Sequence, residues 1–274
     1  MTASPDTHKS AHDSVPRCDS HIHVFSRERD YASATYQPPR KDIDDFRCEA
    51  MVDGIHRAVL IQASIDGTDN GFMVDTLRRT TGIALRGVAV IDEQTPGLVA
   101  MAEAGVRGIR VQNRTRLGQN DLTRLPGLAA RAAAMDWHVE LNTEPARYET
   151  LETLLPRLPE GQALVLDHFG HITPGDEAEL DGLCRLLDTG SMWIKLAPTR
   201  VSRQVGRYDD LAELVRQLAD RYPDRCLWGS DWPHVMTKRP LPQSGDMLAF
   251  LQRTLTIGQY EACLSTNPAT LYRF

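Results

Sequence analysis

The chain has 274 residues, of which 41% are hydrophobic, and a formal net charge of −6. This length suits one large α/β barrel or two smaller domains, and the apolar content is enough for a core that needs no disulfide bonds. The moderate negative charge argues against non-specific binding of nucleic acid, and no apolar run reaches the length of a membrane span.

The N-terminal segment and the cysteines favour a single domain in the cytoplasm. The polar segment 1–16 lacks the hydrophobic stretch of a signal peptide, so we expect a disordered N-terminal leader followed by one domain over 17–274. An odd number of dispersed thiols without a C-x-x-C pair is typical of a reducing, cytoplasmic compartment and argues against a zinc ribbon. These thiols are Cys18, Cys48, Cys184, Cys226 and Cys263.

Short runs rich in Val, Ile and Leu alternate with helix-like stretches along the chain. The predicted strands are 18–24, 57–62, 85–91, 108–112, 137–142, 163–168, 192–196 and 226–231. The predicted helices include 42–54, 71–81, 125–134, 148–155, 176–187 and 208–222. Alternation of this kind predicts a parallel sheet, and eight strands predict a (β/α)₈ TIM barrel. A doubly wound open sheet is the alternative, but no glycine-rich phosphate loop follows any predicted strand.

Two histidines two residues apart, His21 and His23, lie on the first predicted strand. Side chains at this spacing point to the same face of a strand, so the two imidazoles converge. Such a pair can bind a metal, form paired hydrogen bonds, or simply make a polar strand face.

Polar residues also end the other predicted strands. The active site of a barrel lies at the carboxyl ends of its strands, and buried charges are costly unless they are paired or used. We therefore expect a site there, formed by His21, His23, Ser64, Arg110, Asn142, His168, Lys195 and Asp231.

Several of these polar residues also allow a purely structural interpretation. Asp167 can be a hydrogen-bonding residue at a strand end, and Glu140 is expected on the exposed outer face of its strand. For Lys195 the sequence leaves open a core ion pair or a contact with a substrate anion.

Three segments resemble the amidohydrolase superfamily, of the amidohydrolase 2 type. They are His21-Ile22-His23, Asp167-His168-Phe169-Gly170 and the run from Trp228 to His234, which reads WGSDWPH. The similarity extends roughly from Arg17 to Phe274 and is greatest to the branch of 2-pyrone-4,6-dicarboxylate lactonase and related lactonases.

The resemblance implies an enzyme that opens a lactone bearing carboxylates. In that reaction Asp231 activates water, and His21, His23 and His168 stabilise the carbonyl oxygen. Substrate binding is then expected from Arg110, Ser64, Lys195, Arg200, Arg203 and Asn142.

The resemblance also bears on metal binding. Metal-dependent members of the superfamily usually place a lysine or glutamate at the end of strand four and a histidine on strand five. This chain has Arg110 and Asn142 there, and an arginine cannot ligate a cation. We therefore predict no obligatory metal. A single zinc ion held by His21, His23, His168 and Asp231 is the alternative.

Other functions stay open at this point. They are a zinc-dependent hydrolase or decarboxylase of the same superfamily, a sugar-lactone isomerase, and a barrel that binds an organic acid without catalysis. A small carboxylated lactone is the expected partner, with no nucleic acid or membrane, and homo-oligomers are possible.

Overall fold

The structure is a computed structural model that describes residues 15–114, 122–237 and 240–274. The predicted N-terminal leader lies outside the described residues except for its last two positions. Eight parallel strands form one sheet in which each strand pairs with the next along the chain. They are β1 (Arg17–Ile22), β2 (Ile55–Ile61), β3 (Ala84–Ala89), β4 (Val106–Gln112), β5 (His138–Asn142), β6 (Leu164–Leu166), β7 (Met192–Leu196) and β8 (Cys226–Trp228).

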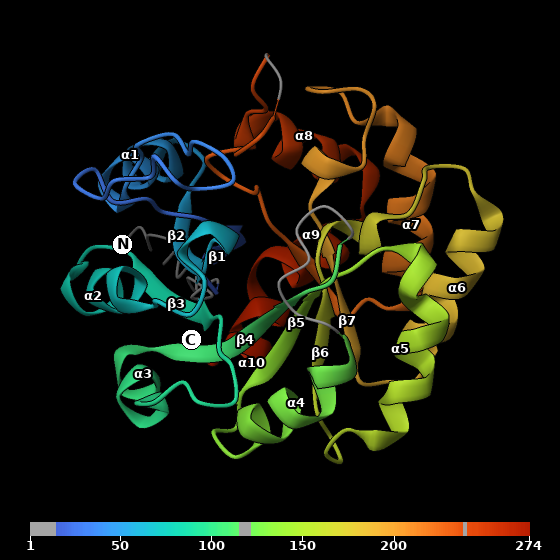
Figure 1. The fold of residues 1–274 in the computed structure, drawn as a ribbon. Helices are drawn as coiled ribbons and strands as arrows, with labels where there is room; N and C mark the ends of the chain where they lie inside the picture. Colours follow the sequence, from blue (N-terminus) through green and yellow to red (C-terminus); the bar gives the residue numbers. More distant parts are fainter. Residues whose placement is uncertain (1–14, 115–121, 238–239) are drawn as a thin grey trace, which may run out of the picture.

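Helices surround these strands, as Figure 1 shows. They are α1 (Ile43–Val52), α2 (Gly71–Arg79), α3 (Leu98–Ala104), α4 (Leu125–Ala133), α5 (Tyr148–Leu154), α6 (Glu177–Asp188), α7 (Ala212–Arg221), α8 (Ser244–Thr254), α9 (Ile257–Glu261) and α10 (Asn267–Tyr272). Among the described residues, no helix is both long enough and apolar enough to cross a bilayer.

The sheet curves until its first and last strands meet. The main-chain N of Asp231 donates to the carbonyl of His21 at 2.9 Å, and the N of His23 donates to the carbonyl of Trp232 at 2.7 Å. These bonds continue the parallel pairing between the ends of β1 and β8, where Ile22 is bridged to Trp232. The predicted (β/α)₈ TIM barrel is confirmed.

The strands β6 and β8 end earlier than their predicted segments 163–168 and 226–231. After each of them the backbone turns into the left-handed region, with φ of 49° at His168 and 63° at Asp231. A residue in this region leaves the extended ladder, so each strand ends before its functional side chain.

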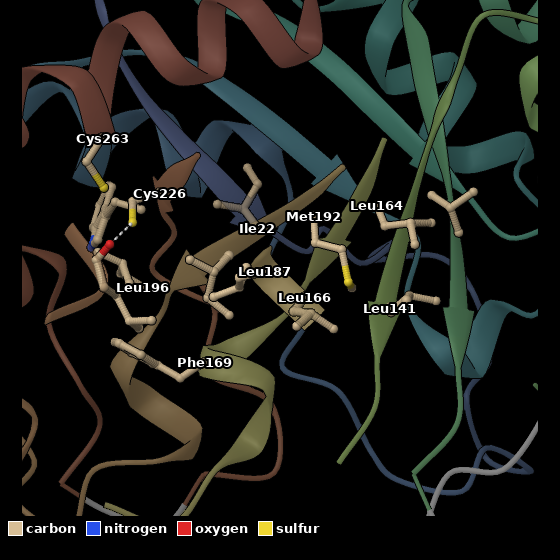
Figure 2. Close-up of a cluster of buried hydrophobic side chains, with 14 of the residues drawn as sticks. Ile22, Leu141, Leu164, Leu166, Phe169, Leu187, Met192, Leu196, Cys226 and Cys263 are labelled. Atoms are coloured by element: carbon tan, nitrogen blue, oxygen red, sulfur yellow. Dashed lines mark hydrogen bonds between the residues drawn. The ribbon is translucent and has the colours of Figure 1, made fainter. Parts of the chain in front are cut away.

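Two apolar layers hold the barrel together. The outer layer packs strand side chains against helices, and Figure 2 shows Leu164, Leu166 and Met192 in one cluster with Leu187 of α6. The second layer gathers side chains from several strands around Tyr272 at the end of α10. This second cluster consists of Cys18, Val59, Ile61, Val88, Val165, Leu227 and Tyr272.

Candidate active site

A cavity of about 200 Å³ is formed at the carboxyl ends of the strands. Seven of the residues predicted for the site line it: His23, Ser64, Arg110, Asn142, His168, Arg200 and Asp231. His21 is fully buried and its ring lies against His23 and His168, with ring centroids 5.0 and 4.8 Å away. Lys195 and Arg203 do not line this cavity.

The junction of β8 with β1 sets the position of His21 relative to Asp231. A Cβ on Gly229 would lie 2.5 Å from the Cβ of His21, so only glycine allows the two strand ends to approach this closely. Below them, Oδ1 of Asp19 accepts hydrogen bonds from the main-chain N of His21 at 3.1 Å and of Ser230 at 2.9 Å. The glycine of the WGSD segment therefore has a structural reason to precede Asp231, and the serine side chain contributes through its Oγ, which accepts a hydrogen bond from the main-chain N of Trp232 at 3.0 Å.

The two oxygens of Asp231 face different partners. Oδ1 lies 3.7 Å from Nε2 of His21 and 3.5 Å from Nε2 of His23. Oδ2 lies 2.6 Å from Nε of Arg200 and accepts a hydrogen bond from Thr199 at 3.3 Å. Burial alone would raise the pKa of Asp231, but the opposing effects, of which the charge of Arg200 is the largest, outweigh it and hold the pKa well below its usual range. Asp231 is therefore a carboxylate.

Two of the histidines, His21 and His168, are neutral near pH 7. Burial, together with the charge of Lys195, lowers the pKa of His21 to about 4. Burial also holds the pKa of His168 well below its usual range. Nδ1 of His23 lies 2.8 Å from the carbonyl oxygen of Ile61, which can only accept, so the ring proton of a neutral His23 lies on Nδ1.

A buried ionic layer lies directly beneath this group. Lys195 Nζ is 2.5 Å from Oε2 of Glu140 and 3.3 Å from Oδ1 of Asp167. Arg110 donates to Oδ2 of Asp167 through Nε at 3.1 Å and Nη2 at 2.9 Å. All three of Glu140, Asp167 and Lys195 are fully buried.

The contacts in this ionic layer test the expectations for Glu140 and Lys195. The prediction that Glu140 lies on the exposed outer face is wrong, because its carboxylate finds partners inside the barrel on β7 and α10. Tyr272 donates to Oε1 of Glu140 at 2.9 Å, and Nε2 of His138 lies 3.3 Å from the same atom. Of the two roles left open for Lys195, the structure places it in the core ion pair.

The loop after β7 separates the two predicted arginines. Arg200 ends the short 3₁₀ turn Pro198–Arg200 and reaches Asp231. Arg203 is exposed, and its main-chain N donates to Oδ2 of Asp210 at 2.8 Å. Only Arg200 lines the cavity.

Sequence reasoning did not single out His171. It follows His168 in the turn His168–His171, where left-handed residues return the chain to the cavity. Nε2 of His171 donates to Oδ1 of Asn142 at 2.8 Å, and burial with the nearby arginines lowers its pKa to about 3. The sequence did offer one signal, because His171 follows three residues after His168. That signal was not sufficient, because a strand that stayed extended through residue 168, as predicted, would not have brought both histidines into one cavity.

Within the part of the chain that the structure describes, two overlapping groups of residues have donor atoms close enough together for one metal ion. They are His21, His23 and Asp231, and His21, Asp167 and His168. His23 suits a metal, because its bond to Ile61 leaves a lone pair on Nε2. His21 does not, because its Nδ1 faces the Lys195 ammonium at 3.2 Å. The site thus holds ligands of the right type, but His21 is not arranged to serve as one.

Comparison with known proteins places the chain among lactone-processing enzymes. It is 30% identical to the 2-pyrone-4,6-dicarboxylate hydrolase of Comamonas testosteroni, over 93% of this chain and 89% of the relative. It is 29% identical to the 4-sulfomuconolactone hydrolase of Hydrogenophaga intermedia, over 93% of this chain and 88% of the relative.

Solved structures share the fold. A Pseudomonas putida protein, provisionally described as a 2-pyrone-4,6-dicarboxylic acid hydrolase, superposes with a TM-score of 0.80 at 28% identity, covering 94% of this chain and 98% of that one. A Burkholderia multivorans amidohydrolase with bound zinc has a TM-score of 0.73 at 19% identity, covering 94% and 99%. The family model for amidohydrolases of type 2 matches residues 18–274. With the barrel, the histidine pair and the strand-eight aspartate in place, this match shows that the chain belongs to the amidohydrolase family.

Proposed function

We propose that this protein hydrolyses a lactone that carries one or more carboxylate or similarly anionic groups. The observation that carries the proposal is the environment of Asp231, a buried carboxylate in a cavity lined by histidines and by the cations Arg110, Arg114 and Arg200. The two relatives described above are named for the hydrolysis of lactones that carry carboxylate or sulfonate groups.

Asp231 and His23 are the groups that act on water. Oδ1 of Asp231 and Nε2 of His23 are both acceptors and lie 3.5 Å apart, so a water beside them can donate to both. Asp231 takes the proton as the water oxygen adds to the lactone carbonyl carbon. The ring C–O bond then breaks, and the departing ring oxygen receives that proton from Asp231, which leaves the ring-opened acid.

The charge that develops on the carbonyl oxygen needs hydrogen-bond donors already in place. We assign this role to His168, which lines the cavity. His21 was expected in the same role, but it is fully buried and does not line the cavity, and its Nε2 lies 3.7 Å from Oδ1 of Asp231, so we assign to it the orientation of this carboxylate. His23 was also expected as such a donor. It is not given this role, because its proton in the neutral form is directed to the carbonyl of Ile61.

The anionic groups of the substrate require cations. An arginine can bind a carboxylate through two parallel hydrogen bonds, and Arg110, Arg114 and Arg200 all border the cavity. Ser64 and Asn142 line the same walls and add neutral hydrogen-bonding groups, with Tyr36 beside Ser64. Lys195 and Arg203 are left out of this substrate-binding set because neither lines the cavity.

We propose that the reaction needs no metal. If zinc binds, His21, His23 and Asp231, with His168 nearby, would hold it, and it would polarise the carbonyl and acidify water. The metal-free mechanism is supported by His21, whose Nδ1 faces the Lys195 ammonium, so that the ring is not arranged to bind a metal.

A matched pair of lactones tests the proposal. We expect the enzyme to open 2-pyrone-4,6-dicarboxylate, or the sulfonated muconolactone, with a kcat/KM at least 100-fold above that for unsubstituted 2-pyrone. Product analysis separates the ring-opened acid from an isomerised lactone. Repeating the assay after extensive treatment with a strong chelator tests the metal, and we expect unchanged activity.

Each part of the proposal has its own contrary result. Tight binding of both anionic lactones without turnover would show a binding protein. An isomeric product would show a lactone isomerase. Loss of activity on chelation that stoichiometric zinc restores would overturn the metal-free mechanism while leaving the lactonase activity in place.

A further inference from the structure

A column of buried polar groups runs beneath His21 toward the closed end of the barrel. It begins at the hydroxyl of Tyr272, continues through Glu140 and Lys195, and ends at Nδ1 of His21. The lactone chemistry proposed above gives Glu140, Lys195 and Tyr272 no part. Burying charged groups costs free energy, so we expect these three residues to have a role outside the proposed chemistry.

Glu140 fixes the position of the lysine ammonium. Its Oε2 is 2.5 Å from Lys195 Nζ, while its Oε1 receives the hydroxyl of Tyr272 and faces His138. Burial alone would raise the pKa of Glu140, but the charge of Lys195 outweighs it and lowers the pKa. The pair is therefore an ammonium and a carboxylate, and the ammonium is held under the ring of His21.

The ammonium decides what Nδ1 of His21 can do. Lys195 Nζ meets Nδ1 at 3.2 Å in hydrogen-bonding geometry, and an ammonium can only donate. Nδ1 must then accept, so a neutral His21 carries its proton on Nε2. Asp167 is the competing partner, because its Oδ1 lies 3.2 Å from the same Nδ1. Among the described residues, however, no group makes a hydrogen bond of good geometry to that Oδ1.

The tautomer of His21 determines what its other ring nitrogen, Nε2, can do. Nε2 of His21 is buried without a hydrogen-bond partner among the described residues and lies 3.7 Å from Oδ1 of Asp231. With a proton there, Nε2 is a donor toward the carboxylate and whatever lies beside it. A metal ion would instead need the lone pair on Nε2 and the proton on Nδ1, directed at the lysine ammonium.

We propose that Lys195 selects the tautomer of His21 that is protonated on Nε2, and so makes His21 a hydrogen-bond donor in place of a metal ligand. Lys195 is thereby a positioning residue that acts on the site through His21. The proposal concerns this ring alone and holds whether or not the substrate is an anionic lactone.

The first experiment reads the tautomer in the native protein. Two-dimensional ¹H–¹⁵N correlation of the histidine rings, on chelator-treated protein near pH 7, distinguishes a protonated from an unprotonated ring nitrogen. His21→Asn and His23→Asn variants assign the signals. We expect His21 protonated on Nε2, and His23, whose Nδ1 faces the Ile61 carbonyl, protonated on Nδ1. A His21 ring protonated on Nδ1 would overturn the proposal, and this result needs no core variant to fold.

The second experiment removes the lysine without stranding its partner. In the double variant Lys195→Met with Glu140→Gln, one cation and one anion leave together, and Nδ1 of His21 becomes free to donate to Asp167. We expect the His21 proton to move to Nδ1 and the zinc Kd to fall at least tenfold, as outer-sphere partners of ligating histidines typically change metal affinity 10- to 100-fold. Calorimetric titration with zinc alone measures this change.

Arg110→Met is the matched control. It removes a positive charge that binds Asp167 but leaves Lys195 against His21. If charge alone governs zinc binding, the control gains more affinity than the charge-balanced double variant. If the tautomer governs it, the double variant gains more and the His21 proton stays on Nε2 in the control. A larger gain in the control, or an unmoved proton in the double variant, would reject the proposal.

Discussion

Nε of Arg200 lies 2.6 Å from Oδ2 of Asp231, which joins the loop after β7 to the end of β8. The ion pair occupies one carboxylate oxygen and leaves the other, Oδ1, facing His21 and His23. Because Arg200 also borders the cavity, an anionic substrate and the proposed base share the same cation.

Replacing Arg200 should therefore move the pH dependence of the reaction. Arg200 is the charged group that lowers the pKa of Asp231 most, so Arg200→Gln raises that pKa. A general base acts only when it is deprotonated, and the acid limb of kcat/KM should shift upward by about 1–3 pH units. Unsubstituted 2-pyrone as substrate keeps anion binding out of the measurement.

The same substitution at Arg203 is the control, because this exposed arginine belongs to the same loop and its side chain lies outside the cavity. We expect its profile to match the wild type. If the acid limb of kcat/KM does not shift in Arg200→Gln, the pKa that governs this limb does not belong to Asp231.

Asp231→Asn should abolish turnover in a folded protein. The amide keeps the shape of the carboxylate but cannot take a proton, and loss of a general base costs about 10²–10⁴-fold in rate. Steady-state kinetics and circular dichroism measure the two effects, with the exposed Asp181→Asn as reference. A folded Asp231→Asn variant with near-native kcat would eliminate this residue as the base.

Lys195→Met alone should strongly destabilise the protein. It leaves the fully buried carboxylate of Glu140 without its cation, and breaking a buried pair in this way costs about 3–5 kcal/mol. The double variant with Glu140→Gln should recover most of this loss. Urea unfolding gives the free energies.

The exposed ion pair of Lys41 and Glu49 provides the comparison. Lys41→Met should cost about 1 kcal/mol or less, since exposed pairs contribute little. Equal losses at Lys41 and Lys195 would contradict a fully buried, paired ammonium.

Gly229→Ala should disturb the junction of β1 with β8. The added Cβ would lie 2.5 Å from the Cβ of His21 and 3.0 Å from its main-chain N. We expect a loss of about 1–3 kcal/mol in unfolding free energy. Because small displacements of catalytic groups are costly, kcat should also fall at least about tenfold.

Gly127→Ala is the matched substitution, at an exposed position of α4 with open space around the new methyl group. It should stabilise the protein by about 0.5–1 kcal/mol, because alanine favours the helix. Native activity in Gly229→Ala would show that the close approach of the strands does not position His21.

The sequence by itself determined the barrel and most of the residues that were expected to form its site. Alternating apolar runs marked all eight strands, and β7 was predicted with its observed bounds. His21, His23, His168 and Asp231 could be brought together in advance, because the carboxyl ends of neighbouring parallel strands meet at one end of a barrel.

Only the tertiary structure decided how these residues are paired. Strand alternation shows that Glu140 shares a face with Asn142, but not that Lys195, 55 residues further along, supplies its counter-charge across the barrel. Arg200 and Arg203 were equal candidates until the path of their loop brought one to Asp231 and left the other exposed. Pairings of this kind depend on distances between elements far apart in the chain, which local patterns of residues do not contain.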